Sequence, residues 1–302
     1  MAYQSVGTPR FYIDHGIWLH SLGLFSPPDE ISSLLGLNPT KVIELTTGYR
    51  VPRYAPINYV AYLGHNGGTM YPEWNDENTG GVDTEITSHI NGQSYSSDNS
   101  VQYSGFSIFF ITDDEQDRMD AYIKSGEGTT IGSISVGSIY EMSHSADLSL
   151  TLGYETGTKT IETRGGASLS NTMWRPPMWG DLGAWELSDP NSATLNQTLA
   201  HSSRRTWSLS FSFLNKTNTF PKYNALNRLI DQNETLPDDE TLLTSDDFFS
   251  VVWNKVGTAL PFIFQPDKDV SEFAICKFTN NFSFQQTAPN LYSVKMKIRE
   301  VW

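Results

Sequence analysis

Residues 204–214 read RRTWSLSFSFL, and this stretch decides the fold class. Large apolar side chains alternate along it with serines, in the order Trp207, Ser208, Leu209, Ser210, Phe211, Ser212 and Phe213. Successive side chains of a strand point to opposite faces, so this period of two predicts a strand with one buried and one polar face. Residues 291–302 repeat the pattern, with Tyr292, Val294, Met296 and Ile298 opposite Ser293, Lys295, Lys297 and Arg299. The C-terminal third is therefore expected to form a sheet with one apolar face.

Apolar or alternating runs extend the prediction of strands over the rest of the chain. Strands are expected at residues 41–46, 57–63, 107–111, 130–140, 148–154, 159–163, 261–264, 273–278 and 281–285. In residues 57–63, one face should carry Tyr59, Ala61 and Leu63, and the other Asn58, Val60 and Tyr62. Residues 159–163 are expected to pair with residues 148–154 across a turn at Gly157.

Two short helices are expected among these strands. Thr112 and Glu115 have the spacing of a capping box, which predicts a helix up to about Lys124 with a buried face of Met119, Tyr122 and Ile123. A second helix is expected at residues 245–256, capped by Ser245 and ended by Gly257. Its predicted inner face consists of Phe248, Phe249, Val252 and Val256. The fold class is thus mainly β, as β-sandwich or barrel domains with two short helices.

The arrangement of turn-rich segments predicts two domains in the 302 residues. Residues 66–100 are rich in glycine, asparagine and serine, and residues 188–203 are polar and linker-like. The first 65 residues are too few to bury their own aromatic side chains. We therefore expect residues 1–65 plus 189–302 to form one β domain, into which residues 66–188 are inserted as a β-sandwich module.

The charge balance excludes several classes of partner. The formal net charge is −14, from 34 acidic and 20 basic residues, and this argues against specific nucleic-acid binding, which needs clustered Lys and Arg. Charged residues make up only 18% of the chain, which fits either an assembly subunit with buried interfaces or a polar, Ser/Thr-rich β protein. No apolar run approaches a membrane span and no signal-like leader is present, so neither membrane insertion nor a secretion route is expected.

Motifs for catalysis or cofactor binding are missing from the sequence. The six histidines are scattered, and the acidic run at residues 113–120 has no calcium-loop glycine or closing glutamate. No G-x-S-x-G elbow, phosphate loop or dinucleotide fingerprint occurs. Cys276, the single cysteine, lies in the apolar run FAICKF, which indicates a buried structural thiol. The sequence therefore predicts a protein that is not an enzyme and holds neither a cofactor nor a metal.

A tryptophan cluster is the best candidate for binding. The segment MWRPPMWGDLGAWEL at residues 173–187 contains Trp174, Trp179 and Trp185. Flat aromatic rings beside polar loops stack on sugars, and tryptophan also anchors protein interfaces. Three interpretations stay open at this point: packing within or between domains, a protein interface, or a glycan contact.

Seven segments across almost the whole chain resemble tail proteins of bacteriophages, above all a group from marine phages. They are GTPRFYIDHGIWLHSLG (7–23), GSISVGSIYEMSHSADLSLTLGYE (132–155), RGGASLSNTMWRPPMWGDLGAWEL (164–187), RRTWSLSFSFL (204–214), PFIFQPD (261–267), FAICKF (273–278) and YSVKMKIREVW (292–302). Their order resembles distal-tail or tail-tip (baseplate hub) proteins. The middle module is also similar to galactose-binding-type jelly rolls, although a clear acidic–serine motif of that type is absent.

This resemblance implies a tail-tube-like domain carrying an inserted jelly-roll-like sandwich, and a non-catalytic structural role in the virion tail. The implied partners are further copies of the chain in a hexameric ring and the tube, hub and fibre proteins, with assembly in the host cytoplasm. Residues 291–302 are expected to close the domain or to form a seam between subunits through Met296, Ile298 and Trp302. The alternative function is a carbohydrate-binding module of the tail that recognises a host surface glycan.

Overall fold

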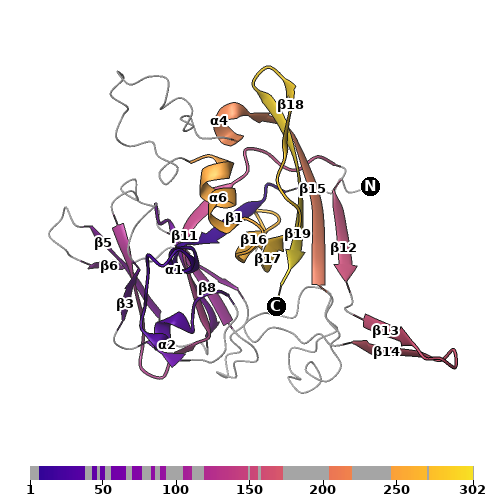
Figure 1. Ribbon diagram of the computed structural model, residues 1–302. Helices are drawn as coiled ribbons and strands as arrows, with labels where there is room; N and C mark the ends of the chain where they lie inside the picture. The colour runs from indigo at the N-terminus through magenta and orange to yellow at the C-terminus, as the bar shows by residue number, and fades with distance from the viewer. Residues whose placement is uncertain are drawn as a thin grey trace.

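The computed structural model describes residues 7–37, 43–45, 48–51, 56–65, 70–76, 83–85, 89–92, 105–110, 119–148, 150–155, 158–172, 204–219, 246–270 and 272–301. The chain is mainly β, with antiparallel sheets and a few short helices (Figure 1). This confirms the predicted fold class.

One sheet of eleven strands forms the framework. In order across the sheet, its strands are β12 (Thr151–Glu155), β15 (Arg204–Asn215), β19 (Leu291–Glu300), β17 (Ala274–Phe278), β16 (Phe262–Gln265), β1 (Arg10–Asp14), β11 (Ser133–Glu141), β4 (Tyr59–His65), β8 (Gly105–Phe110) and β7 (His89–Gly92), and β18 (Phe284–Ala288) also pairs with β19. β1, near the N-terminus, therefore lies in the middle of the sheet.

Smaller sheets and short helices complete the described structure. The small sheets are β3 (Tyr49–Val51), β9 (Met119–Ser125), β5 (Met70–Asp76) and β6 (Asp83–Glu85) in that order, the pair β2 (Ile43–Glu44) and β10 (Thr130–Ile131), and the hairpin β13 (Thr158–Glu162) and β14 (Ser168–Thr172). The helical elements are α1 (His15–Ser21), α2 (Asp29–Ser32), α4 (Lys216–Thr219), the π-helical turn η3 (Phe249–Trp253) and α6 (Asn254–Val256).

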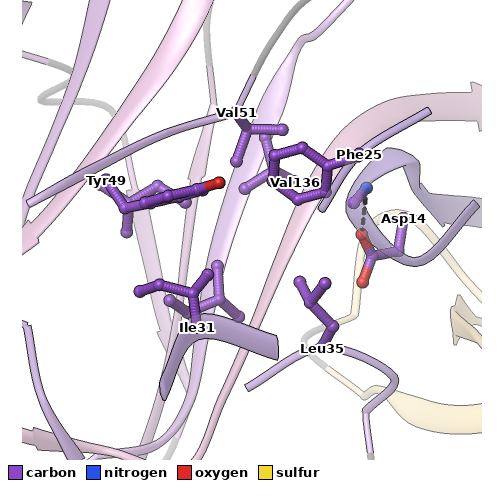
Figure 2. A pocket seen from close by; sticks show the side chains of 10 residues that line it. Asp14, Phe25, Ile31, Leu35, Tyr49, Val51 and Val136 are labelled. Carbon is purple, nitrogen blue, oxygen red and sulfur yellow. Dashed lines mark hydrogen bonds between the residues drawn. The ribbon is translucent and has the colours of Figure 1, made fainter. Parts of the chain in front are cut away.

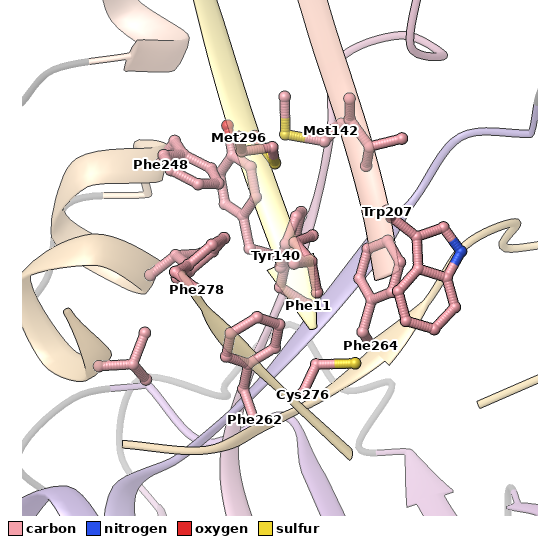
Figure 3. Close-up of a cluster of buried hydrophobic side chains, with 14 of the residues drawn as sticks. Phe11, Tyr140, Met142, Trp207, Phe248, Phe262, Phe264, Cys276, Phe278 and Met296 are labelled. Atoms are coloured by element: carbon pink, nitrogen blue, oxygen red, sulfur yellow. The ribbon is translucent and has the colours of Figure 1, made fainter. Parts of the chain in front are cut away.

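The main core covers one face of β15 and β19, as their alternation predicts. Trp207, Leu209, Phe211, Val294, Met296 and Ile298 are all buried in it. Aromatic rings from other elements meet them there, and the rings of Phe11 and Phe248 lie edge to face at 5.6 Å (Figure 3). Each fully buried side chain of this size contributes roughly 1.5–3 kcal/mol to the free energy of folding. This aromatic core fixes β15 and β19 against η3.

β4 is buried on both faces, which explains why its sequence is almost entirely apolar. Tyr59, Ala61 and Leu63 pack in one cluster of buried side chains, and Val60 and Tyr62 pack in another. The two predicted faces are therefore confirmed, and both are interior. β4 reaches this position because β11 pairs with one of its edges and β8 with the other.

A helical segment is confirmed within the expected range 245–256, as the π-helical turn η3 followed by α6. The Asp247 carboxylate accepts hydrogen bonds from the backbone N and the hydroxyl of Ser250, at 3.0 and 2.7 Å. Gly257 ends the helix with a φ of 48°, a left-handed conformation that glycine adopts without strain. Ser245, the expected cap, lies outside the described residues.

The helix expected up to Lys124 is wrong over the residues that the structure describes. Residues 119–125 form β9, which pairs with β3 on one edge and β5 on the other. Ala121, Ile123 and Ser125 are buried at alternate positions, the period of a strand. Pairing on both edges outweighs the local helix signal, and Thr112 and Glu115 lie outside the described residues.

The expected hairpin of residues 148–154 with 159–163 is also wrong. β12 pairs with β15, in the register Leu152 opposite Trp207, and β13 pairs with β14. The tight turn belongs instead to the second pair, where Gly166 has a φ of 80°. A close hairpin partner was available to β13 on its C-terminal side, which leaves β12 free to extend the large sheet.

The division into residues 1–65 plus 189–302 and an inserted module 66–188 is not reproduced in the sheet order. β11, from the expected module, lies between β1 and β4, and β12 forms the end of the sheet beside β15. The backbone groups of β1 are paired with β11 on one edge and β16 on the other. One sheet therefore crosses both expected boundaries.

The alternation in β15 breaks at its C-terminal end. The register with β19 shifts between Phe211 and Leu214, as in a β-bulge, and Phe213 has a φ of 65°. Phe213 was expected to be buried with Phe211, but it is 72% exposed, and Leu214 is buried in its place. The bulge therefore turns one large aromatic side chain out of the core.

Candidate assembly interface

The outer edge of the large sheet carries apolar side chains that the protein does not cover. β12 pairs with β15 on one edge and is the last strand on this side of the described sheet. Leu152 and Tyr154 point to the same side as Trp207, yet they are 41% and 53% exposed and neither belongs to the main core. An edge strand with exposed apolar side chains is a ready site for association with another chain.

The hairpin β13–β14 follows β12 and extends away from the large sheet (Figure 1). Ile161 and Leu169 are directly opposite each other across the hairpin and are 56% and 61% exposed. An isolated two-stranded hairpin is marginally stable in water, because it has too little apolar area to bury. A partner that covers Ile161 and Leu169 would supply that area.

Two further exposed apolar residues lie at the opposite end of β12. Leu148 is 87% exposed and precedes β12, and Phe213 is exposed by the bulge of β15. Asp147, which precedes β12, binds β15 here, since its carboxylate accepts hydrogen bonds from the hydroxyls of Ser210 and Ser212 at 2.9 Å each. We use the name apolar edge surface for the set Leu148, Leu152, Tyr154, Ile161, Leu169 and Phe213.

A group of cations lies on the face of β15, β19 and β17 that points away from the main core. The strand registers place Arg204, Lys277, Lys295, Lys297 and Arg299 together on this face, which we call the basic face. Lys295 and Lys297 are exposed, and Arg299 forms an ion pair of 2.7 Å with Glu155 of β12. Burial, and then the nearby charge of Arg299, lower the pKa of Arg204. The like charges therefore interact with one another across the strands.

A cleft of about 380 Å³ opens at one end of the basic face. Its walls are mostly apolar and include Leu37, Leu260 and Ile275, and Arg204 and Lys277 contribute the two charged side chains to its lining. The combination of apolar walls with cations suits a group that is both apolar and negatively charged.

The described interior also holds a cluster of titratable groups around α1. Asp14 is fully buried, its Oδ1 accepts from the backbone N of Gly16 at 2.8 Å, and burial raises its pKa to about 7. His15, with its pKa lowered by burial and then by the charge of Lys255, has its Nε2 2.9 Å from the Ser138 hydroxyl. The cavity beside Asp14 has a volume of about 10 Å³ (Figure 2), which is room for one water at most. This cluster therefore anchors α1 and leaves no space for a substrate.

The residues singled out from the sequence are not brought together in the described structure. Met296 and Ile298 are each 1% exposed and face the main core, so their assignment to a subunit seam is wrong. β19 lies between β15 on one edge and β17 and β18 on the other, which makes it an interior strand. Trp302 and the cluster of Trp174, Trp179 and Trp185 lie outside the described residues.

The comparisons with known proteins identify no relatives. No family model, no curated protein and no solved structure matches the chain. Within the described parts of the chain, no group of three or more His, Cys, Asp or Glu side chains is placed to hold a metal ion. The helices that the structure describes include none long and apolar enough to cross a membrane.

Proposed function

We propose that the chain is a non-catalytic structural subunit of a bacteriophage tail, a distal-tail or tail-tip ring or baseplate hub subunit that joins the tail tube to the tip. The observation that supports this proposal best is the apolar edge surface. Six large apolar side chains, each at least 41% exposed, follow one edge of the sheet and the hairpin beside it. Large apolar side chains left exposed along one edge of a protein are typical of protein–protein contacts.

The proposed ring requires a contact between different faces of neighbouring subunits. In such a contact, a neighbour covers the sheet edge and the hairpin with another part of its own surface. Heterologous contacts of that kind form closed rings when the rotation between subunits closes. The resemblance of segments such as RRTWSLSFSFL and YSVKMKIREVW to tail proteins supports the phage setting.

The first experiment compares the purified chain with the double variant Ile161→Ser/Leu169→Ser, by sedimentation velocity and negative-stain imaging. We expect rings for the wild type and monomers for the variant, with equal melting temperatures because both side chains are more than half exposed. The control variant Thr160→Ala/Ser170→Ala changes the opposite face of the same hairpin and should still form rings. A monomeric wild type, or rings from the Ile161/Leu169 variant, would contradict the proposal.

The second experiment tests the phage setting. Antibodies raised against the chain should label the end of the tail distal to the capsid in virions of a phage that encodes it. Labelling of the capsid, or virions that lack the chain, would refute a role in the tail.

A further inference from the structure

We propose that the basic face of one subunit binds the acidic loop between β16 and β17 of a second copy of the chain, so that the subunits associate head to tail. This inference rests on the proposed assembly function and names the surfaces that meet.

The basic face calls for a negatively charged partner. Arg204, Lys277 and Arg299 are on adjacent strands with their side chains on one side, and Glu155 of β12 forms an ion pair with Arg299 there. Like charges at this spacing repel one another, and an anion that lies over them relieves the repulsion. The charge stands out because the chain as a whole carries −14.

A second copy of the same chain is the partner that this charge distribution favours. With five cations gathered on one face, the rest of the surface is more acidic than the average of the chain. A two-fold symmetric contact through the basic face would bring cations against cations. A head-to-tail contact brings the basic face against an acidic surface instead, and it is the kind of contact that closes into a ring.

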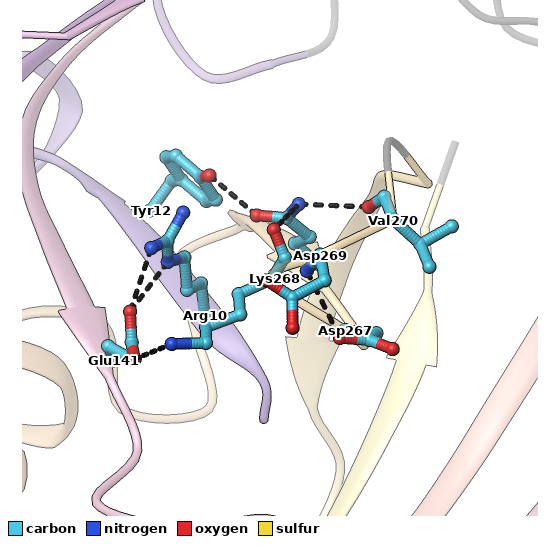
Figure 4. A network of polar contacts seen from close by, with 8 residues as sticks. Arg10, Tyr12, Glu141, Asp267, Lys268, Asp269 and Val270 are labelled. Carbon is cyan, nitrogen blue, oxygen red and sulfur yellow. Dashed lines mark hydrogen bonds and ion pairs between the residues drawn. The ribbon is translucent and has the colours of Figure 1, made fainter. Parts of the chain in front are cut away.

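The loop of residues 267–272 has the chemistry that the basic face and its cleft require. It contains Asp267, Asp269 and Glu272, and its one cation, Lys268, forms an ion pair of 3.0 Å with Glu141 (Figure 4). Between the carboxylates, Val270 is 45% exposed. An apolar side chain flanked by carboxylates matches the cleft, with its apolar walls and the cations of Arg204 and Lys277.

Hydrogen bonds fix residues 267–270 of the loop before it meets a partner. The Gln265 side-chain amide donates to the carbonyl oxygens of Lys268 and Val270, at 3.3 and 2.9 Å. The Asp267 carboxylate accepts from the backbone N of Asp269 at 3.1 Å, and the Tyr12 hydroxyl donates to Gln265 at 2.7 Å (Figure 4). A preformed loop loses little conformational entropy when it binds, which strengthens the association.

The loop and the cleft lie on different parts of the same hairpin. The loop joins β16 to β17 beyond Gln265, and the cleft is lined by Pro261 and Lys277, beyond the register pair Phe262 and Cys276, and by Ile275 in the middle of β16 and β17. A head-to-tail contact brings the loop of one subunit onto the cleft of the next.

A charge-swap experiment tests the pairing. The face variant is Lys295→Glu/Lys297→Glu, and the loop variant is Asp269→Lys/Glu272→Lys; all four side chains are exposed, so the fold should be retained. We expect each variant alone to self-associate at least about tenfold more weakly than the wild type in sedimentation velocity, since like charges then meet at the contact. An equimolar mixture of the two should recover association, because each mutated surface finds an oppositely charged partner.

Charge changes at other exposed positions serve as controls. Lys216→Glu, and Glu44→Lys/Glu127→Lys, change exposed charges elsewhere and should leave association unchanged. Association that the Ile161→Ser/Leu169→Ser variant abolishes but neither charge variant weakens would overturn this inference and leave the proposed function standing. A mixture of the two charge variants whose association does not recover would also overturn this inference. The same holds for a face variant that self-associates normally but loses affinity for a DNA oligonucleotide. A wild type that stays monomeric overturns the proposed function itself, and the inference with it.

Discussion

Arg205 and Glu300 form an ion pair of 2.9 Å in the protein interior, with each side chain 9% exposed. Glu300 also accepts from the backbone N of Arg205 at 2.8 Å, and the guanidinium donates to the carbonyl oxygen of Phe273 at 3.2 Å. The same guanidinium lies 5.3 Å from the ring centre of Trp207. The pair therefore joins the start of β15 to the end of β19 and connects both to the segment before β17.

Removing one charge of this pair should destabilise the protein strongly. Glu300→Gln leaves the Arg205 guanidinium buried without a counter-charge, so we expect the free energy of unfolding to fall by about 3–5 kcal/mol. Glu155→Gln is the matched control, since its pair with Arg299 is 44% and 36% exposed and such pairs contribute about 0–1 kcal/mol. Urea unfolding of both variants measures the difference. Similar decreases in the free energy of unfolding would show that burial does not increase the contribution of the Arg205–Glu300 pair to stability.

Gly137 should not tolerate a side chain. A Cβ at this position would clash with the carbonyl oxygen of Ile13, where β11 pairs with β1 in the middle of the sheet. We expect Gly137→Ala to lower the free energy of unfolding by about 2–3 kcal/mol, because the backbone of a central strand has to shift. Gly165→Ala has open space around the added methyl group and should change it by less than about 0.5 kcal/mol. Thermal and urea melts that rank the two variants in the reverse order would be inconsistent with this packing.

Asp14 should make stability fall as pH rises. Its pKa is about 7 in the folded chain, because burial disfavours the charged form, against about 3.9 in an unfolded chain. Between these values the folded state binds more protons than the unfolded state, so this contribution is complete below about pH 4 and is lost by about pH 7. The difference corresponds to roughly 4 kcal/mol.

Asp14→Asn provides the test of that pH dependence. The Asn side-chain oxygen can still accept from the backbone N atoms of Gly16 and Ile17, so the start of α1 keeps its cap. We expect the free energy of unfolding, measured by urea unfolding at a series of pH values, to lose its decline between about pH 4 and 7. Asp14→Ala should lose the same decline but also about 1 kcal/mol at every pH, from the missing cap. A wild-type decline that persists in both variants would assign the titration to another group.

The sequence predicts the strands well where local alternation and final burial agree. Trp207, Leu209 and Phe211 alternate in the sequence and are buried in the structure, as are Met296 and Ile298. It fails at β9, where a capping-box spacing precedes residues whose conformation is set by pairing with β3 and β5. Local propensity contains no information about such distant partners. It also contains none about the sheet order that places β11 beside β1.

The candidate interface could not be predicted, because exposure depends on strand order. Leu152 and Tyr154 alternate with small polar residues just as Leu209 and Phe211 do, and the alternation is the same in an edge strand and a central one. What exposes them is the position of β12 at the end of the sheet. The bulge that exposes Phe213 likewise arises from the register of β15 against β19, which no local pattern in residues 204–214 reveals.

Phe213 should prove useful for assembly and unfavourable for folding. A left-handed φ of 65° costs a non-glycine residue roughly 1 kcal/mol, and at 72% exposure its ring recovers little by burial. We therefore expect Phe213→Gly to keep or raise the free energy of unfolding, by up to about 1 kcal/mol, while self-association weakens because one member of the apolar edge surface is lost. Phe211→Ala, at a fully buried position of the same strand, should instead lose about 3–5 kcal/mol. Urea unfolding and sedimentation velocity on one preparation separate the two effects. A Phe213→Gly chain that associates like the wild type would remove Phe213 from the interface, and one that unfolds more easily would show that its ring packs on the fold.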